Sequence, residues 1–179
     1  SLLQPGREQV AAGYILYGPS TVFALTIGTG VDLFVLDPAI GAFVRVQQGV
    51  KIPQAAKSYS VNEGNRLSFP EGYQRYLTWA QEQTYSSRYA GAMVADVHRI
   101  LLKGGVFLYP PTRKAPQGKL RLMYEANPIG YVVEHAGGAA STGYERILDI
   151  PPEKVHQRVA VILGSKEEVD TVVGYHQPG

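Results

Sequence analysis

Six polar side chains, at positions expected in loops and at the ends of elements, are the residues best suited to bind an anion. They are Asn62, Arg88, Tyr89, Tyr109, Lys119 and Arg121. A phosphate dianion needs several hydrogen-bond donors and at least one cation, and tyrosine hydroxyls are donors that stay neutral at pH 7. The set therefore favours a phosphate site, although scattered basic and tyrosine residues also occur on ordinary solvated surfaces.

Other kinds of chemistry find no support in the residue types and spacings. The chain has no cysteine, and its four histidines, His98, His135, His156 and His176, are not spaced as metal ligands on one face of a helix. No Gly-x-Ser-x-Gly motif occurs, and Gly28-Thr29-Gly30 lacks the third glycine of a dinucleotide-binding loop. Thiol, zinc, acyl-transfer and nicotinamide chemistry are therefore disfavoured.

The acidic residues are scattered along the chain. Two-metal phosphoryl transfer needs several carboxylate oxygens on ions about 3.5–4 Å apart, and such ligands usually occur as close pairs. Glu167 and Glu168 are adjacent, but we expect them in the first turn of a helix, where they balance its dipole. Glu125 is the acid expected to be partly withdrawn from water, and a structural carboxylate at a helix N-terminus is the alternative for it.

A mixed β-sheet flanked by helices is the architecture that best positions these residues. The chain has 179 residues, 45% of them hydrophobic, which suffices for one ordinary domain with its own core. Twenty glycines and 12 prolines interrupt it too often for a helical bundle. Three β-rich runs joined by short turns predict an antiparallel meander, and strands and helices then alternate, so the fold class is α/β.

Hydrophobic periodicity and turn residues place the individual elements. Helices are expected at residues 7–17, 70–83, 89–103 and 125–135, and after Ser165. Strands are expected at residues 21–27, 31–36, 42–46, 58–61, 106–109, 147–150 and 159–163. Residues 120–123 fit either a strand or the lead into a helix, and the Pro-rich, cationic stretch 111–118 is expected to be an exposed loop.

Charge and hydropathy argue against two classes of partner. Lys plus Arg number 17 and Asp plus Glu 15, a net charge of +2, which is too small to favour nucleic acid or an anionic membrane. No run of about 18 uncharged apolar residues occurs, so no membrane span is predicted. The residues from Ser1 onward lack an initiator Met and a signal-peptide pattern, so we expect the chain to be part of a longer one.

A series of short segments, in order along nearly the whole chain, matches one known family of enzymes. They are Gln4-Pro5-Gly6, Ala11-Ala12-Gly13-Tyr14, Tyr17-Gly18, Leu36-Asp37-Pro38-Ala39, Tyr59-Ser60-Val61-Asn62-Glu63-Gly64-Asn65, Ser87-Arg88-Tyr89, Met93-Val94-Ala95-Asp96-Val97-His98-Arg99, Gly104-Gly105-Val106-Phe107-Leu108-Tyr109-Pro110, Gly118-Lys119-Leu120-Arg121-Leu122-Met123-Tyr124-Glu125-Ala126-Asn127-Pro128, His156-Gln157-Arg158 and Ile162-Leu163-Gly164-Ser165. With them the chain resembles the C-terminal half of class I fructose-1,6-bisphosphatase. Asn65, where some members have Tyr, favours the bacterial type and leaves one phosphate contact open.

The resemblance implies both a fold and an activity. The fold is the C-terminal, sugar-phosphate-binding domain of the sugar phosphatase superfamily, which includes fructose-1,6-bisphosphatase and inositol monophosphatase, and it would occupy residues 1–179. The activity is hydrolysis of fructose 1,6-bisphosphate to fructose 6-phosphate and phosphate, assisted by Mg²⁺ or Mn²⁺. The implied enzyme is cytoplasmic, serves carbohydrate metabolism such as gluconeogenesis, and is a homo-oligomer, tetrameric when full length.

The resemblance also implies a role for each candidate residue. The side chains implied to hold the 6-phosphate and the sugar are Asn62, Tyr89, Tyr109 and Lys119. The backbone of Met93 would meet the sugar hydroxyls, and Arg88 would reach the site of a neighbouring subunit. Arg121 would lie near the 1-phosphate, and Glu125 would be a metal-binding carboxylate.

The family's other metal carboxylates belong to an N-terminal half that the resemblance leaves outside this chain. One carboxylate cannot hold two metals in fixed geometry, so we expect no appreciable hydrolysis by the chain alone. Separation from that half would expose an apolar face, which favours oligomers or aggregation. Two alternatives remain, a free-standing sugar-phosphate-binding module and a sedoheptulose 1,7-bisphosphatase, although Asn62-Glu63-Gly64 argues for the fructose enzyme.

Overall fold

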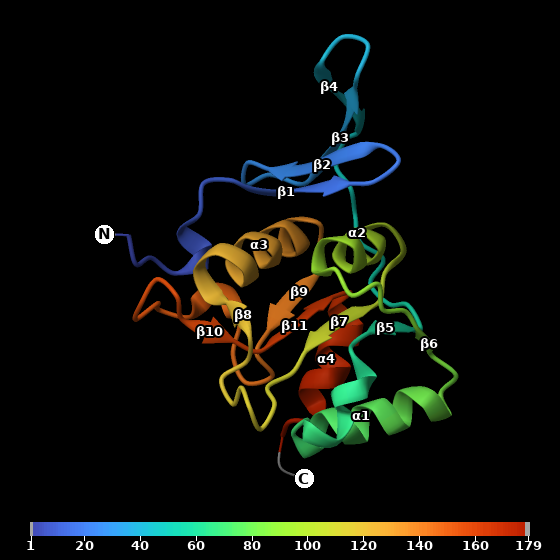
Figure 1. Cartoon of the computed structure of the whole chain (residues 1–179), viewed down its shortest axis with the longest axis vertical. Helices are drawn as coiled ribbons and strands as arrows, with labels where there is room; N and C mark the ends of the chain where they lie inside the picture. Colours follow the sequence, from blue (N-terminus) through green and yellow to red (C-terminus); the bar gives the residue numbers. More distant parts are fainter. Residues whose placement is uncertain (1, 178–179) are drawn as a thin grey trace.

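The fold is a stack of two sheets and two layers of helices. The computed structural model describes residues 2–177, so the first residue and the last two of the expected 1–179 domain lie outside the described part. In Figure 1 a four-stranded sheet lies over α2 (Met93–Lys103) and α3 (Asn127–His135), which lie over a five-stranded sheet. The far face of that sheet carries α1 (Glu71–Glu82) and α4 (Lys166–Gly174). The predicted α/β class is confirmed.

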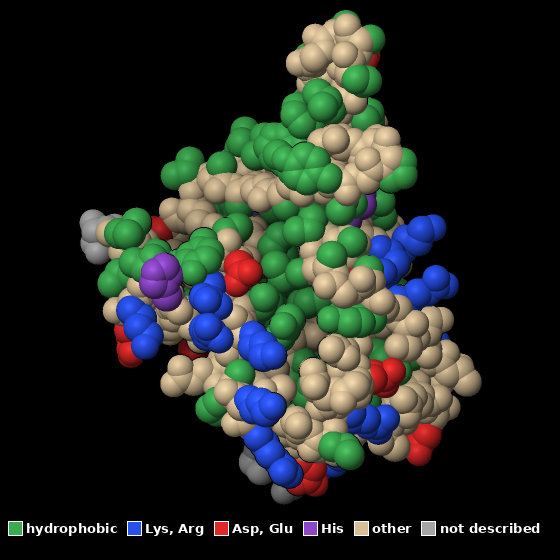
Figure 2. Space-filling model, in the orientation of Figure 1, with side chains coloured by type: hydrophobic (Ala, Val, Ile, Leu, Met, Phe, Trp, Pro, Cys, Tyr) green, Lys and Arg blue, Asp and Glu red, His purple; other side chains and the backbone are tan. Residues whose placement is uncertain are grey.

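The four-stranded sheet is an antiparallel meander in chain order. Its strands are β1 (Ala12–Tyr17), β2 (Thr21–Thr26), β3 (Asp32–Asp37) and β4 (Ala42–Gln47). The three strands predicted between residues 21 and 46 are confirmed, and they form a sheet of their own together with β1. The hairpin of β3 and β4 projects from the body of the molecule (Figures 1 and 2). Every residue of β4 is exposed.

The helix predicted at residues 7–17 is wrong, because a strand occupies most of this segment. Ala12 and Tyr14 are buried while Gly13 between them is only half-buried, which is the period of two that a strand requires. Val10 is 84% and Tyr17 79% exposed, so the helical spacing of Val10, Tyr14 and Tyr17 does not form one buried face. A glycine in a helix interior is also unfavourable.

The five-stranded sheet is mixed. Its order is β6 (Ser86–Ser87), β5 (Ser58–Ser60), β7 (Val106–Tyr109), β11 (Val161–Gly164) and β9 (Ala139–Ser141). The strands β6, β5 and β7 run parallel, whereas β11 is antiparallel to both β7 and β9. A separate two-stranded ladder joins β8 (Leu120–Arg121) to β10 (Arg158–Val159).

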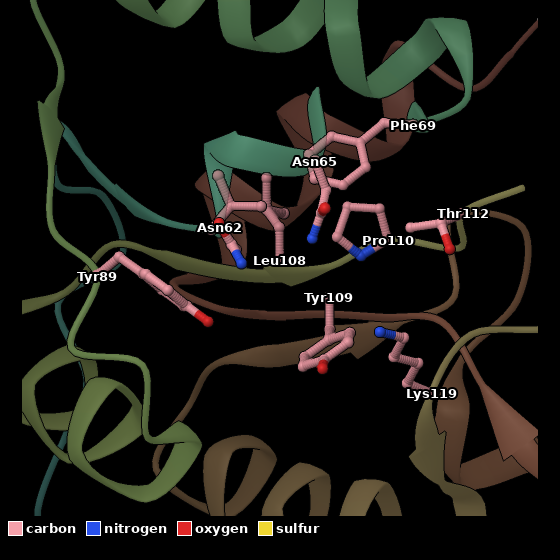
Figure 3. A pocket seen from close by; sticks show the side chains of 10 residues that line it. Asn62, Asn65, Phe69, Tyr89, Leu108, Tyr109, Pro110, Thr112 and Lys119 are labelled. Atoms are coloured by element: carbon pink, nitrogen blue, oxygen red, sulfur yellow. The ribbon is translucent and has the colours of Figure 1, made fainter. Parts of the chain in front are cut away.

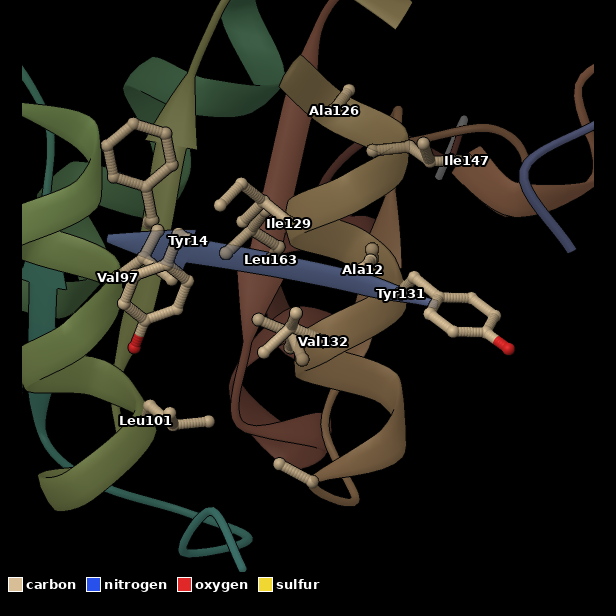
Figure 4. Packing of buried hydrophobic residues seen from close by; sticks show 14 of the residues in the cluster. Ala12, Tyr14, Val97, Leu101, Ala126, Ile129, Tyr131, Val132, Ile147 and Leu163 are labelled. Atoms are coloured by element: carbon tan, nitrogen blue, oxygen red, sulfur yellow. The ribbon is translucent and has the colours of Figure 1, made fainter. Parts of the chain in front are cut away.

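Successive side chains of β7 pack into two different hydrophobic clusters, one on each face of the sheet. Val106 and Leu108 belong to the cluster on the side of α1 and α4. Phe107 belongs instead to the cluster between the two sheets. Residues of β1, α2, α3 and β11 build that cluster, and Figure 4 shows part of it. Because successive side chains of a strand alternate between its faces, Tyr109 lies on the same side of the sheet as Phe107. Tyr109 therefore stands at the end of β7, partly packed against the inner cluster.

Apart from the wrong helix at residues 7–17, the predicted helices are present, two of them with later starts. The helices predicted at 70–83 and after Ser165 are confirmed as α1 and α4, and the one predicted at 125–135 is confirmed as α3, which begins at Asn127. The helix predicted from residue 89 begins only at Met93, because Gly91 has a φ of +81°, outside the helical region. No helix within residues 2–177 is both long and apolar enough to cross a lipid bilayer.

The strand predicted at residues 147–150 is wrong. The segment Ile147–Asp149 is a single turn of 3₁₀-helix that buries Ile147 and Leu148. Periodicity cannot separate a strand from a helical turn in so short an apolar run. Residues 120–123 combine both predicted possibilities, because β8 leads directly into a π-helical turn, Leu122–Ala126, that continues as α3.

Glu168 is a carboxylate that the fold withdraws from water. It lies in the first turn of α4, is 5% exposed, and accepts hydrogen bonds from the Tyr85 hydroxyl at 3.1 and 2.9 Å. Burial raises the pKa of its carboxyl above the ordinary glutamate value, although the bond from Tyr85 acts in the opposite direction. The folded state thus binds this proton more tightly than the unfolded state.

The stabilisation from protonated Glu168 is full below the ordinary carboxyl pKa and is lost as pH rises through the raised value. We expect Glu168→Gln, which cannot ionise, to gain stability relative to the unaltered chain as pH rises from about 4 to 7. Urea unfolding at a series of pH values measures this difference. Glu71→Gln is the control, because Glu71 is an exposed carboxylate in the first turn of α1. A stability difference for Glu168→Gln that stays constant with pH would contradict the expectation.

Candidate functional site

Three neighbouring parallel strands end at the same edge of the five-stranded sheet. Tyr59 of β5 lies opposite Ser87 of β6 and Val106 of β7, and all three strands run toward this edge, where β7 continues to Tyr109. The residues near these carboxyl ends are Tyr89 after β6, Asn62 after β5 and Tyr109 at the end of β7. Ligands of open α/β sheets bind outside the carboxyl ends of the parallel strands.

A pocket of about 90 Å³ lies at this edge. Its lining residues are Val61, Asn62, Asn65, Phe69, Tyr89, Leu108, Tyr109, Pro110, Thr112 and Lys119 (Figure 3). The volume is well above the roughly 10–15 Å³ that one water molecule needs, so a group of several heavy atoms has room. The structure therefore brings four predicted residues into one pocket: Asn62, Tyr89, Tyr109 and Lys119.

Four polar side chains of the pocket offer it hydrogen-bond donors: Asn62, Tyr89, Tyr109 and Lys119. The Asn62 Oδ1 accepts the Gly64 N–H at 3.2 Å, which leaves the amide NH₂ to face the pocket (Figure 3). Within residues 2–177 the Tyr89 and Tyr109 hydroxyls have no hydrogen-bond partner, and no carboxylate pairs with the Lys119 ammonium. Burial, and then the nearby Tyr109 and Asp96, raise the pKa of Tyr89, so its hydroxyl remains a donor.

The loop after β7 carries Lys119 into the pocket. Gly118 has a φ of +92°, and a Cβ at this position would overlap the Val159 carbonyl, so only glycine lets the chain approach β10 so closely. Arg121 on β8 then donates from Nη1 to the Lys119 carbonyl at 3.0 Å. The local backbone geometry therefore positions Lys119, while its side chain is exposed.

Four of the predicted site residues lie outside the lining. Arg88 is exposed and precedes Tyr89, and Met93, the first residue of α2, packs partly against the core. Arg121 is not among the lining residues, and its Nη1 donates to the Lys119 carbonyl. Glu125 is half-buried in the π-helical turn, and its Oε2 accepts the Arg121 N–H at 2.6 Å.

The acidic residues do not form a metal site by themselves. No group of three or more His, Asp or Glu side chains within residues 2–177 is arranged to hold a metal ion. Hard divalent cations take about six oxygen ligands, and Mg²⁺ usually keeps some of its water when one or two carboxylates bind it. Glu125 supplies a single carboxylate, so the residues present in this chain do not fit a complete metal centre.

Sequence reasoning missed the apolar wall of the pocket and one hydroxyl. Val61, Phe69, Leu108 and Pro110 line it although each looked like an ordinary strand or turn residue, and Thr112 lies in the loop expected to be merely exposed. Asn65, the position at which some family members have Tyr, also lines the pocket. Asn65 thus adds an amide beside that of Asn62 (Figure 3).

The composition of the pocket decides its chemistry. It contains one cation and several neutral donors, and its lining includes no carboxylate and no histidine. Such a site suits a phosphate monoester, because donors and a cation match its charge and its oxygen atoms. It offers no general base, so it is suited to binding rather than to bond cleavage. The fold and the site together define an α/β domain whose pocket has the composition expected of an anion site.

Comparisons with known proteins place the chain in one family. Residues 52–177 match the family model described as fructose-1-6-bisphosphatase, C-terminal domain, and residues 1–48 match that of the N-terminal domain. The chain therefore belongs to the fructose-1,6-bisphosphatase family. The two matches meet between β4 and β5, so the meander matches the N-terminal model. The assignment of all 179 residues to one sugar-phosphate-binding domain stays a prediction.

The similar proteins include bacterial and protozoan enzymes. The chain is 56% identical to a class 1 fructose-1,6-bisphosphatase of Synechococcus sp. strain JA-2-3B'a(2-13), over 96% of this chain and 52% of that protein. It is 51% identical to that of Nostoc punctiforme, over 99% of this chain and 51% of that protein. A crystal structure of Leishmania major fructose-1,6-bisphosphatase in holo form has a TM-score of 0.96 and 42% identity, covering 98% of this chain and 55% of that one. The chain thus spans about half the length of these relatives.

The Lys119 ammonium is expected to dominate anion binding in the pocket. A hydrogen bond to a charged group contributes about 1.5–3 kcal/mol, so we expect Lys119→Gln to weaken inorganic phosphate binding about 10- to 150-fold. Isothermal titration calorimetry with inorganic phosphate measures this change. Lys114→Gln, which removes an exposed cation of the same loop outside the pocket, should change the affinity less than about threefold. Equal losses of phosphate affinity in the two variants would show that binding depends on the overall charge of the loop and not on the pocket.

Proposed function

We propose that this chain supplies the sugar-phosphate site of a metal-dependent fructose-1,6-bisphosphatase. The reaction is hydrolysis of fructose 1,6-bisphosphate to fructose 6-phosphate and phosphate. The observation that carries the proposal is the convergence of Asn62, Tyr89, Tyr109 and Lys119 on one acid-free pocket. Membership of the fructose-1,6-bisphosphatase family supports the substrate class.

The pocket is proposed to hold the phosphate that does not react. Lys119 neutralises part of its charge, and the Tyr89 and Tyr109 hydroxyls and the Asn62 amide donate to its oxygens and to the sugar. A binding group remote from the reacting bond lowers the barrier by fixing the substrate's orientation. The absence of a carboxylate or histidine from the lining supports this passive role.

The residues outside the lining are assigned to the rest of the substrate. We assign Met93 to the sugar hydroxyls through its backbone, and Arg121 to the neighbourhood of the 1-phosphate. The exposed side chain of Arg88 is free to reach a neighbouring subunit of a homo-oligomer, tetrameric in the full-length enzyme. Glu125 is proposed as one ligand of the Mg²⁺ or Mn²⁺ site, with its Oε1 available because Oε2 accepts the Arg121 N–H.

The N-terminal half of the enzyme is the proposed partner that completes the site. The relatives are about twice as long as this chain, and its residues 1–48 match the N-terminal domain model of the family. Within residues 2–177 no group of three or more His, Asp or Glu side chains is placed to hold a metal ion. The chain alone is therefore proposed to bind the product fructose 6-phosphate but not to hydrolyse the bisphosphate.

The direct test compares the chain with the longer protein that contains it. Phosphate release from fructose 1,6-bisphosphate with excess Mg²⁺ should be at background for the chain, and should reach about 1–10³ s⁻¹ for the longer protein. Calorimetry should show that the chain still binds fructose 6-phosphate. Turnover in that range by the chain alone would refute the division of roles.

Two further measurements separate the alternatives. Competition between fructose 1,6-bisphosphate and sedoheptulose 1,7-bisphosphate on the longer protein gives the ratio of their kcat/KM values, and a ratio favouring the seven-carbon sugar would overturn the proposed substrate. A longer protein that binds fructose 6-phosphate yet releases no phosphate would identify a binding module instead.

A further inference from the structure

The short segment that carries Tyr89 into the pocket is held by two charged residues of α2. Residues 88–92 connect β6 to α2, and Gly91 with its φ of +81° breaks regular structure before the helix begins. The Tyr89 side chain is 45% exposed, and within residues 2–177 its hydroxyl has no partner. Its own contacts therefore do little to fix its position.

Asp96 holds the segment on the C-terminal side of Tyr89. Its side chain is completely buried, and both carboxylate oxygens accept the Ala90 N–H, at 2.9 and 3.2 Å. The same carboxylate forms an ion pair with Arg99, Oδ1 to Nη1, at 2.9 Å. A buried carboxylate is costly unless it is paired and hydrogen-bonded, so this arrangement stabilises one position of the segment.

Arg99 holds the segment on the N-terminal side. Its Nη2 donates to the Arg88 carbonyl at 3.1 Å and to the Ser60 hydroxyl of β5 at 2.5 Å. The Arg88 N–H in turn donates to the Tyr59 carbonyl at 2.8 Å. The Arg99 guanidinium thus connects two parts of the chain: β5, which leads to Asn62, and the segment that carries Tyr89. Lysine lacks the planar group that makes both bonds possible.

We propose that the Asp96–Arg99 pair positions Tyr89, and so sets how tightly the pocket holds phosphate. The inference rests on the proposed phosphate site but concerns residues that do not line it. The pair acts through the backbone on both sides of one aromatic residue. Asp96 and Arg99 are therefore positioning residues and need not touch the ligand.

A double-mutant cycle with inorganic phosphate as the probe tests the inference in the full chain. Arg99→Lys keeps a positive charge for Asp96 but cannot reach both Ser60 and the Arg88 carbonyl. We expect it to weaken phosphate binding about tenfold when Tyr89 is present, and less than about threefold in the Tyr89→Phe background. An effect that operates through Tyr89 is lost when the hydroxyl is lost, whereas a general structural effect is additive.

The control is Arg146→Lys, because Arg146 pairs with Glu134 and Asp149 and does not line the pocket. It should leave phosphate affinity unchanged in both backgrounds. Ser60→Ala, which removes one bond of Arg99 and preserves the ion pair, should reproduce part of the loss if Arg99→Lys does not fold. Equal losses in the Tyr89 and Tyr89→Phe backgrounds would overturn the inference.

The same measurements distinguish this failure from failure of the phosphate site itself. If Tyr89→Phe and Lys119→Gln both leave phosphate affinity unchanged, the site is wrong and the positioning role falls with it. If those variants weaken binding but the cycle is additive, the site stands and only the positioning role is wrong.

Discussion

Parallel pairing of β5 with both β6 and β7 is the constraint on which the pocket depends. Because the three strands run in the same direction, their chains emerge at one edge of the sheet and bring Tyr89, Asn62 and Tyr109 together. Side chains alternate along a strand, so a shift of one residue in this pairing would turn Tyr109 to the other face of the sheet. The hydrogen bonds between backbones thus place side chains that are far apart in the sequence.

Sequence reasoning succeeded where a local pattern determines the structure and failed where a longer-range contact decides. The residues of β7 form a short apolar run bounded by glycine and proline, and the predicted strand has the observed bounds. The apolar spacing of residues 7–17 and 147–150 fits more than one kind of secondary structure. Pairing with β2 makes the first segment largely a strand, and packing against α3 accompanies the 3₁₀ turn of the second. The chemistry of their side chains made the polar residues of the pocket candidates for anion binding. Their placement in one shared site was predicted from the resemblance to the family. Asp96 and Arg99 look like ordinary polar positions of a helix until their partners in the preceding loop and in β5 are seen.

The donor-rich pocket and the acid proposed for metal binding lie in separate parts of the molecule. The pocket at the strand ends gathers donors and one cation, whereas the acid proposed for metal binding, Glu125, lies outside it in the π-helical turn. Such turns are frequent at functional sites, and this one directs the Glu125 carboxylate back to the Arg121 N–H. Lys119 and Arg121 link the two regions through a single hydrogen bond. Under the proposed function, a substrate with two phosphates would be held at one end by this chain and would require further acidic residues at the other.

A crystal structure of the chain with fructose 6-phosphate tests the central claim most directly. The account predicts phosphate oxygens within hydrogen-bond distance of the Asn62 amide, the Tyr89 and Tyr109 hydroxyls and the Lys119 ammonium, with the sugar extending toward Met93. A ligand bound elsewhere while this pocket holds only water would contradict it.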